Sequence, residues 1–564
     1  MKKKYISKAT VLLLSLTFSL TSCNEWLDLQ PNNEQVADDY WKSKEDVEQM
    51  VASGYVYMRK SVPTLINWGE LRGGDFYNMS AGSKANKLQD FDMLPTNDLC
   101  SYAELYKVIL MANSVLEYAP GVDDATYYEA MRNSHLCEAY FQRAWAYSIL
   151  VKNFKEVPLV TNAYVNDNMS FMLPKASESQ IIAQIKSDVK MALATGSAKG
   201  YYEEEWQTKG RVTKWALYAL MADICLWNHE FDECIEYADY ILKATDNMRP
   251  VFMTETSKWF EMFYPGLSNE SIFELYWDYK TEGANNNFTD KFPKLGTLTS
   301  SSDDGECNVT EYALTRIAAE LSEVSKNQGG FSTDQRVGRM LNASVVANTV
   351  IASGNGMSLS QPVLWKYRGT DIVDNTTVRV NDDANFILYR VADVMLMKAE
   401  ALVMKGKASW KEAIELINKI RVRAALPVFV DLTASDVEDQ IDSMDELTML
   451  MEVLNQREME FLGEAHRWYD ILRLARYDRR FAPSGTVEDN EDLGYEAYNT
   501  QGFISDEFQC KSSALSIIME SNRTTSKVQL ESILQNSWAW YLPLPNRDIQ
   551  TNALLEQNPY YIFK

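Results

Sequence analysis

Histidines, carboxylate runs and cysteines are the residues of this sequence whose types suit catalysis or metal binding. His135, His229 and His466 are its only histidines, and their spacing matches neither a zinc site nor an HExxH helix. The sequence also contains no GxSxG turn, phosphate-binding loop or dinucleotide fingerprint. Carboxylates are abundant, so an acid pair of the kind glycosidases use stays an open alternative. The sequence therefore predicts a protein that is not an enzyme.

Three acidic runs are interpreted as solvated loop charge, because neighbouring like charges repel unless a cation lies between them. They cover residues 203–205, 303–304 and 382–383. None has the spacing of a calcium-binding loop. No cofactor is expected, with a structural Ca²⁺ ion left as an open alternative.

The six cysteines beyond residue 23 form no CxxC pair and match no dense disulfide framework. They are predicted to be buried thiols, with a disulfide between Cys225 and Cys234 as the alternative. The six are Cys100, Cys137, Cys225, Cys234, Cys307 and Cys510.

The first 23 residues have the pattern of an export signal. Four lysines precede an apolar stretch at residues 11–20 that is too short to span a bilayer. Leu20-Thr21-Ser22-Cys23 follows and resembles the lipobox of bacterial lipoproteins. We expect a signal peptide at residues 1–22, acylation of Cys23, a tether at residues 23–40, and membrane attachment through lipid only. An ordinary signal peptide with a chance cysteine is the alternative.

Composition indicates an ordinary globular body that does not bind nucleic acid. Among 564 residues there are 79 Asp+Glu and 55 Lys+Arg, a formal net charge of −24. Phosphate binding needs clustered cations, which this balance does not favour. The aromatic content of 12% is high and offers many rings for packing or for ligand contact.

Helical periodicity dominates residues 41–564, which are expected to form a single body. Ser43 and Ser177 open capping boxes, and helices are predicted at residues 103–118 and 127–151. Two helical hairpins are predicted, at residues 213–227 with 231–243 and at residues 386–404 with 409–425. The fold class is therefore mostly α, an irregular tetratricopeptide-like helical-repeat scaffold. Long loops and a short strand at residues 271–277 interrupt it, with excursions near 247–383 and 481–527.

Several other side chains receive structural interpretations. Trp145, Trp215, Trp227 and Trp468 lie in predicted helices and are expected in the core. Arg72 and Asp75 are expected to brace a turn by ion pairing. An alternating charge series is expected on one helix, paired within that helix. Its members are Arg457, Glu458, Arg467, Asp470 and Arg473.

An ordered set of segments resembles the SusD/RagB family of surface lipoproteins along most of the chain. The early segments are the lipobox, Gly69-Glu70-Leu71-Arg72-Gly73-Gly74-Asp75 and Glu138-Ala139-Tyr140-Phe141-Gln142-Arg143-Ala144. The later segments are Tyr389-Arg390-Val391-Ala392-Asp393, Arg467-Trp468-Tyr469-Asp470 and Leu542-Pro543-Leu544-Pro545. Gly463-Glu464-Ala465-His466 departs from the family's usual Glu-Gly before the Arg-Trp pair.

This resemblance implies a function in glycan uptake. Proteins of this family sit on the outer membrane and capture oligosaccharide without catalysis. They act as a hinged lid on a SusC-like TonB-dependent transporter. The resemblance therefore implies a surface-exposed, lipid-anchored protein whose partners are that transporter and an oligosaccharide.

Sugar capture favours aromatic rings in loops, because pyranose C–H faces pack on flat rings while amides and carboxylates satisfy the hydroxyls. The family's binding aromatics come from roughly two regions that these loops match, without a residue-by-residue correspondence. Buried packing is the alternative for each ring. The candidate ligand-binding residues are Phe76, Tyr77, Asn78, Trp277, Tyr279 and Phe288.

Three rival functions remain open at this stage. Peptide capture on the same fold predicts a deep cavity lined by polar backbone. A surface glycoside hydrolase predicts two carboxylates facing each other across one cleft, about 5–10 Å apart. A purely structural scaffold predicts no pocket for a ligand.

Overall fold

The structure is a computed structural model of the 564-residue chain. It describes residues 40–80, 84–163, 172–283, 285–293, 305–313, 364–370, 379–478, 509–522 and 524–562, together with residues 316, 336 and 340. The predicted signal peptide, the predicted acylation site Cys23 and the predicted tether lie outside the described residues, apart from residue 40 of the tether.

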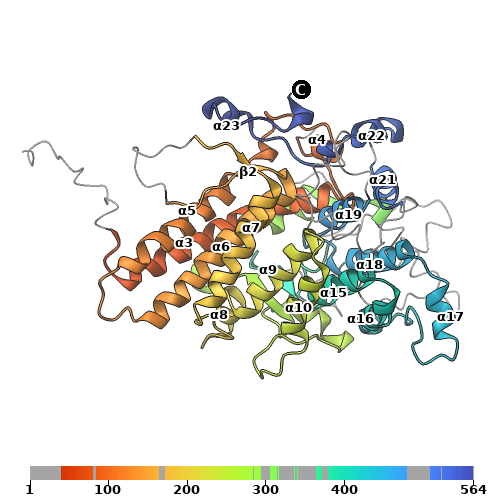
Figure 1. The fold of residues 1–564 in the computed structure, drawn as a ribbon, viewed down its shortest axis with the longest axis horizontal. Coiled ribbons are helices and arrows are strands. Elements are labelled where there is room, and N and C mark those ends of the chain that lie inside the picture. Colours follow the sequence, from red (N-terminus) through yellow and green to blue (C-terminus); the bar gives the residue numbers. More distant parts are fainter. Residues whose placement is uncertain are drawn as a thin grey trace, which may run out of the picture.

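The fold is mostly α-helical, as predicted, and its long helices pack side by side in chain order (Figure 1). The long helices α3, α5, α6, α7, α9 and α10 each pack against the next, and α15 continues the row against α10. The long helices are α3 (Lys44–Ile66), α5 (Ala103–Tyr118), α6 (Glu129–Phe154), α7 (Glu178–Ala194), α9 (Lys214–Trp227), α10 (Phe231–Leu242), α15 (Val391–Lys405), α16 (Trp410–Arg423), α18 (Glu446–Phe461), α19 (Arg467–Arg476), α21 (Cys510–Ser521) and α22 (Lys527–Leu534).

Short helices and three two-stranded antiparallel sheets complete the described part of the chain. The sheets pair β1 (Phe76–Asn78) with β5 (Cys307–Val309), β2 (Val157–Pro158) with β3 (Lys175–Ala176), and β4 (Ser271–Leu275) with β6 (Phe386–Arg390). The short helices are α4 (Lys84–Gln89), α8 (Glu205–Gly210), α11 (Tyr279–Glu282), α17 (Val437–Asp442) and α23 (Asn546–Thr551). None of the helices in the described ranges has the length and apolar character needed to cross a membrane.

The capping boxes form as predicted at both serines. The Ser43 hydroxyl accepts from the Asp46 backbone N–H, and the Asp46 carboxylate accepts from the Ser43 backbone N–H at 2.8 Å. Ser177 and Gln180 repeat this arrangement at the start of α7. Each box satisfies N–H groups that the first helical turn leaves without a partner inside the helix. Local sequence therefore determines where these two helices begin.

Helix α15 begins later than predicted. Residues 386–390, expected to be helical, form strand β6, which pairs antiparallel with β4 at residues such as Phe386 opposite Leu275. The segment is largely buried on both sides, so its apolar residues fit a strand and a buried helix equally well by pattern. The neighbouring strand decides between the two.

Large aromatic side chains and free thiols fill the core. The four helical tryptophans expected there are all buried. All six cysteines beyond residue 23 are buried and free, so the alternative disulfide between Cys225 and Cys234 is wrong. Burial raises the pKa of the Cys137 thiol to about 11, which keeps it protonated and unreactive at neutral pH.

Candidate functional site

A cavity of about 330 Å³ lies where strand β1 and helix α4 meet the C-terminal helix α21. Two predicted ligand-binding residues, Tyr77 and Asn78 of β1, line it and are half-buried. Amide and hydroxyl side chains supply most of the other polar groups, and among its described lining residues none is acidic. The complete lining is Leu71, Arg72, Gly74, Tyr77, Asn78, Met79, Asn86, Gln89, Phe91, Ile518, Ser521, Asn522 and Thr524.

Strand β1 is held along both of its edges. One edge pairs with β5, where Tyr77 lies opposite Asn308. On the other edge Gln89 acts as a substitute strand: its side-chain amide donates to the Phe76 carbonyl at 2.8 Å, and its side-chain oxygen accepts from the Asn78 N–H at 3.3 Å. These bonds fix the backbone that carries Tyr77 before any ligand arrives.

The C-terminal residues that line the cavity are hydrogen-bonded directly to Gln89 and Asp90. The Asn522 side-chain amide donates to the Gln89 carbonyl at 2.8 Å, and Thr524 hydrogen-bonds the Asp90 carboxylate. Gly74 has φ +83°, and a Cβ built there would lie 2.1 Å from the Ser521 Oγ. Only glycine therefore allows the loop to pass this close to α21.

Arg72 and Asp75 both hold the turn before β1, but they do not pair with each other. Asp75 lies 3.6 Å from the guanidinium of Arg467 in α19, so its charged neighbour is Arg467 and not Arg72. Arg72 instead lies over the Trp468 ring, 4.1 Å from its centroid, and donates to the Trp540 carbonyl. The Arg72 guanidinium is thus engaged with the protein core, because an aromatic face and a carbonyl satisfy it without a carboxylate.

The cavity is suited to a ligand rich in hydroxyl groups. Side-chain amides and hydroxyls both donate and accept hydrogen bonds, and a tyrosine ring offers a flat face for stacking. Phe91, Met79 and Ile518 add apolar surface between the polar groups. A few polar groups among apolar ones are typical of small-molecule sites.

The other predicted aromatics do not reach this cavity. Phe76 and Phe288 are 1% and 0% exposed, and Trp277 is 7% exposed, so their rings serve packing in this structure. A chain of ring contacts joins them: Trp277 to Phe288 at 5.6 Å, Phe288 to Tyr367 at 5.2 Å, Tyr367 to Phe292 at 6.0 Å, and Phe292 to Phe76 at 5.6 Å. The prediction that these three rings offer stacking faces is therefore corrected: neighbouring rings occupy those faces.

Tyr279 is the exception among the distant candidates. It begins α11, is 39% exposed, and lies outside the cavity lining. Sequence reasoning missed Asn86, Gln89 and the α21 residues as single positions. The range predicted as a loop-rich excursion, residues 481–527, includes Asn522 and Thr524, but its residues 510–521 form helix α21 and not a loop.

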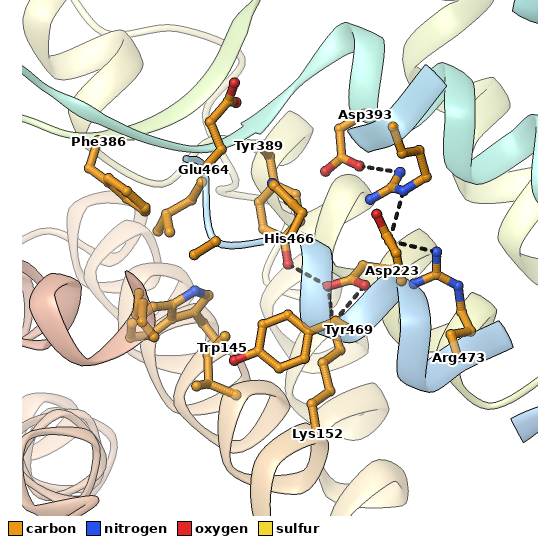
Figure 2. Close-up of a pocket in the computed structure, with 16 residues that line it drawn as sticks. Trp145, Lys152, Asp223, Phe386, Tyr389, Asp393, Glu464, His466, Tyr469 and Arg473 are labelled. Carbon is orange, nitrogen blue, oxygen red and sulfur yellow. Dashed lines mark hydrogen bonds and ion pairs between the residues drawn. The ribbon is translucent and has the colours of Figure 1, made fainter. Parts of the chain in front are cut away.

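A second cavity, of about 60 Å³, lies inside the helical body and is surrounded by charged groups (Figure 2). Lys152 donates to both carboxylate oxygens of Asp223, at 2.7 and 2.6 Å, and the Tyr389 hydroxyl donates to the same group at 2.9 Å. This volume has room for on the order of two water molecules. A glycan does not fit it, so it belongs to the internal polar network.

The expectation that the charge series lies on one helix and pairs within it is wrong. The series falls on two helices, α18 and α19, and only the contact between Arg473 and Asp470 at 2.8 Å lies within one helix. Arg457 bonds Asp393 of α15 and Asp470 of α19, each at 2.8 Å. Burial raises the pKa of Asp470, but the charges of Arg457 and Arg473 outweigh it and lower that pKa below its usual range. These carboxylates are held as ion pairs and do not form a catalytic acid pair.

The three acidic runs have different surroundings in the structure. Residues 203–205 are exposed, as expected for solvated charge, whereas residues 303–304 lie outside the described part of the chain. Asp382 accepts from Arg368 at 2.7 Å and Asp383 lies 3.6 Å from Arg379. The third run is therefore paired, and its interpretation as purely solvated charge is wrong.

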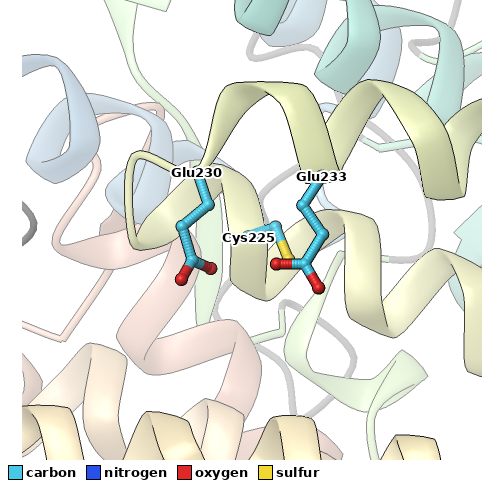
Figure 3. Close-up of side chains that lie close together, drawn as sticks. All are labelled: Cys225, Glu230 and Glu233. Atoms are coloured by element: carbon cyan, nitrogen blue, oxygen red, sulfur yellow. The ribbon is translucent and has the colours of Figure 1, made fainter. Parts of the chain in front are cut away.

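Cys225, Glu230 and Glu233 bring three potential metal ligands together at the α9–α10 turn (Figure 3). The Lys186 ammonium donates to Glu230 at 2.7 Å and to Glu233 at 2.6 Å. Burial raises the pKa of the Cys225 thiol well above its usual value. A lysine already supplies the positive charge, and a thiol that resists deprotonation is a poor metal ligand.

The row of packed helices and the cavity between β1, α4 and α21 define a helical-repeat protein with a cavity suited to a polar ligand. A family model described as "SusD family" matches residues 271–561, and one described as "Starch-binding associating with outer membrane" matches residues 25–226. The chain therefore belongs to the SusD family.

Individual relatives match this chain over nearly their whole lengths. SusD-like protein P38 of Formosa agariphila is 27% identical over 494 residues, which cover 84% of this chain and 92% of that protein. A surface glycan-binding protein A from Bacteroides uniformis has a TM-score of 0.62 at 19% identity, covering 92% of this chain and 100% of that one. A solved laminarin binding SusD-like protein has a TM-score of 0.60 at 19% identity, with the same two coverages of 92% and 100%. These structural likenesses establish the fold.

Proposed function

We propose that this protein captures an oligosaccharide at the cell surface without catalysis and delivers it to a SusC-like TonB-dependent transporter, acting as a hinged lid. The observation that carries the proposal is the cavity of about 330 Å³ lined by Tyr77, Asn78 and further amide and hydroxyl side chains. Such a lining matches sugar hydroxyls and offers one ring for a pyranose face.

Two structural relatives support an oligosaccharide as the ligand. One is named as laminarin binding and the other as a surface glycan-binding protein. Each aligns with this chain over its whole length, at a sequence identity of 19%. These relatives support a glycan as the ligand of the Tyr77 cavity, and the binding experiment has to identify its sugar and linkage.

The positions and pairing of the carboxylates support capture without catalysis. The carboxylates around the inner cavity are paired with lysine or arginine, and the described lining of the Tyr77 cavity contains no carboxylate. Glycoside hydrolysis needs two carboxyl groups flanking the sugar. Attachment to the outer membrane would come from acylation of Cys23, and the net charge of −24 offers an acidic surface to a complementary transporter rim.

Affinity electrophoresis tests the proposal directly. Full-length protein in mild detergent is run in native gels that contain laminarin, starch, xylan or galactomannan, with analysis of released sugars alongside. We expect retardation by at least one glycan and no released oligosaccharide. Tyr77→Ala is expected to weaken that retardation about three- to tenfold, the range for loss of one aromatic contact.

Tyr128→Ala is the matched control, because Tyr128 is a tyrosine 61% exposed just before α6 and outside the cavity. It is expected to migrate like the wild type. Retardation by none of the four glycans, together with binding of a peptide mixture, would assign the cavity to peptide cargo. Released oligosaccharides would contradict the absence of catalysis.

A further inference from the structure

A large, exposed indole stands on short helix α8, away from the Tyr77 cavity. Trp206 is 41% exposed, and its ring stacks on Tyr276 with centroids 5.6 Å apart and an interplanar angle of 23°. Tyr276 follows strand β4 and is half-buried. One face of the indole is therefore backed by a second ring, while the indole remains partly exposed to water.

The surroundings hold this ring pair in place. Arg59 donates to the Tyr276 carbonyl at 3.0 Å, and the buried Lys209 of α8 donates to the Ser271 carbonyl of β4 at 2.8 Å. A Cβ at Gly210 would lie 3.1 Å from the Tyr276 Cβ, so glycine lets α8 lie closely against this residue. A surface fixed in advance loses little conformational entropy when a ligand stacks on it.

The charges beside the pair narrow the class of ligand. Glu203, Glu204 and Glu205 are exposed and directly precede Trp206. Carboxylates accept hydrogen bonds from hydroxyl groups and repel anions. This combination favours an uncharged, hydroxyl-rich ligand over a uronate, a sulfated sugar or an anionic lipid.

We propose that Trp206 and Tyr276 form a second carbohydrate-binding surface, which stacks on uncharged sugar residues of a long glycan chain. This inference rests on the proposed glycan-binding function. Helix α8 lies at one edge of the molecule, and helices α4 and α21, which wall the Tyr77 cavity, lie toward the opposite edge (Figure 1). Only a long chain reaches both sites, and two linked contacts hold it more tightly than either one alone.

A sugar fits this surface better than a protein partner does. Specific protein interfaces bury roughly 800 Å² on each side, around a core of several apolar residues. A single ring pair beside three carboxylates is far smaller than that and matches the size of one or two sugar rings. Binding of the transporter at this surface is the competing outcome that the test must detect.

The test compares long and short forms of one glycan on the full-length protein in mild detergent. The polymer is the one among laminarin, starch, xylan and galactomannan that retards the wild type, and the short form is its trisaccharide. Trp206→Ala is expected to weaken retention by the polymer about three- to tenfold and to leave trisaccharide binding by calorimetry unchanged. Trp206→Phe keeps a ring, so its retention by the polymer is expected to fall between that of the wild type and that of Trp206→Ala. Tyr128→Ala is expected to match the wild type.

Four results would overturn the inference. Equal retention of the wild type and Trp206→Ala by the polymer excludes a role for the indole. Loss of trisaccharide binding in Trp206→Ala contradicts a separate second surface. Loss of transporter co-purification from membranes with unchanged polymer retention assigns Trp206 to a protein interface. Failure of the wild type to bind any of the four glycans removes the proposed function itself, and the second surface with it.

Discussion

The guanidinium of Arg473 in α19 binds the carboxylate of Glu400 in α15 through two hydrogen bonds of 2.6 Å each. Both side chains are buried, and the Tyr477 hydroxyl donates to the same carboxylate at 2.7 Å. This two-point contact joins the helical row to the C-terminal segment that carries α21. Buried ion pairs of this kind are costly to break from one side, because the remaining charge keeps no partner.

Arg473→Met should therefore lower the free energy of unfolding by about 3–5 kcal/mol, the cost of leaving a buried charge unpaired. The double variant Arg473→Met with Glu400→Met should be less destabilised than Arg473→Met alone. Urea unfolding followed by circular dichroism measures both. The control is Glu438→Leu, which removes the exposed partner of Lys411 and should change stability by less than about 1 kcal/mol. Equal stability of Arg473→Met and wild type would show that the pair contributes nothing.

Gly74→Ala should disturb the Tyr77 cavity. The new methyl group would meet Ser521 at a position where φ is +83°, so either α21 or the loop must shift. We expect a loss of about 1–3 kcal/mol in stability, as for other strained backbone positions, together with weaker retention in glycan gels. Gly121→Ala is the control, because a Cβ there meets nothing within 4 Å. Unchanged stability and retention in Gly74→Ala would contradict the close packing of this loop against α21.

Glu48 should make stability depend on pH in the acid range. Burial raises its pKa, but hydrogen bonds and charges from His135 and Arg211 outweigh it and bring the pKa to about 2. An unfolded Glu titrates near 4.3, so the carboxylate stabilises the fold above that pH, and this contribution is lost as pH falls toward about 2.

The stability difference between wild type and Glu48→Gln should therefore be largest above about pH 4.5 and shrink steadily below it. Urea midpoints at pH 6, 4 and 3 measure this difference. Glu45→Gln is the control, since Glu45 is 64% exposed on the same helix, and its difference should stay small throughout. A Glu48→Gln difference that is constant over this range would refute the assignment.

Cys23→Ser should release the protein from the membrane. Acyl chains on Cys23 are the predicted anchor, and each buried CH₂ group contributes about 0.8 kcal/mol to attachment. Ultracentrifugation of lysed cells should place the wild type in the membrane pellet and Cys23→Ser in the supernatant. Replacement of a structural cysteine, as in Cys100→Ala, should leave the protein in the pellet. Recovery of Cys23→Ser with the membranes would contradict a lipid-only anchor.

Sequence by itself determined the features that depend on neighbouring residues along the chain. The helix predicted at residues 103–118 has those limits in the structure, and both capping boxes form at Ser43 and Ser177. These signals lie within one or two helical turns, where backbone hydrogen bonding and side-chain periodicity act directly. The ordered family segments, read from the same sequence, also identified the fold class and the family.

Tertiary structure alone decided which distant residues meet. Gln89 and Asn522 are 433 positions apart, yet their hydrogen bond closes the Tyr77 cavity. Arg457 bonds residues of α15 and α19 in place of its helical neighbours, and Phe288 is covered by other rings where the sequence allowed an open loop. Local patterns specify residue type and helix face, whereas burial, ring contacts and charge pairing depend on how separate helices pack. For that reason the sequence indicated Tyr77 and Asn78, while the cavity around them required the folded chain.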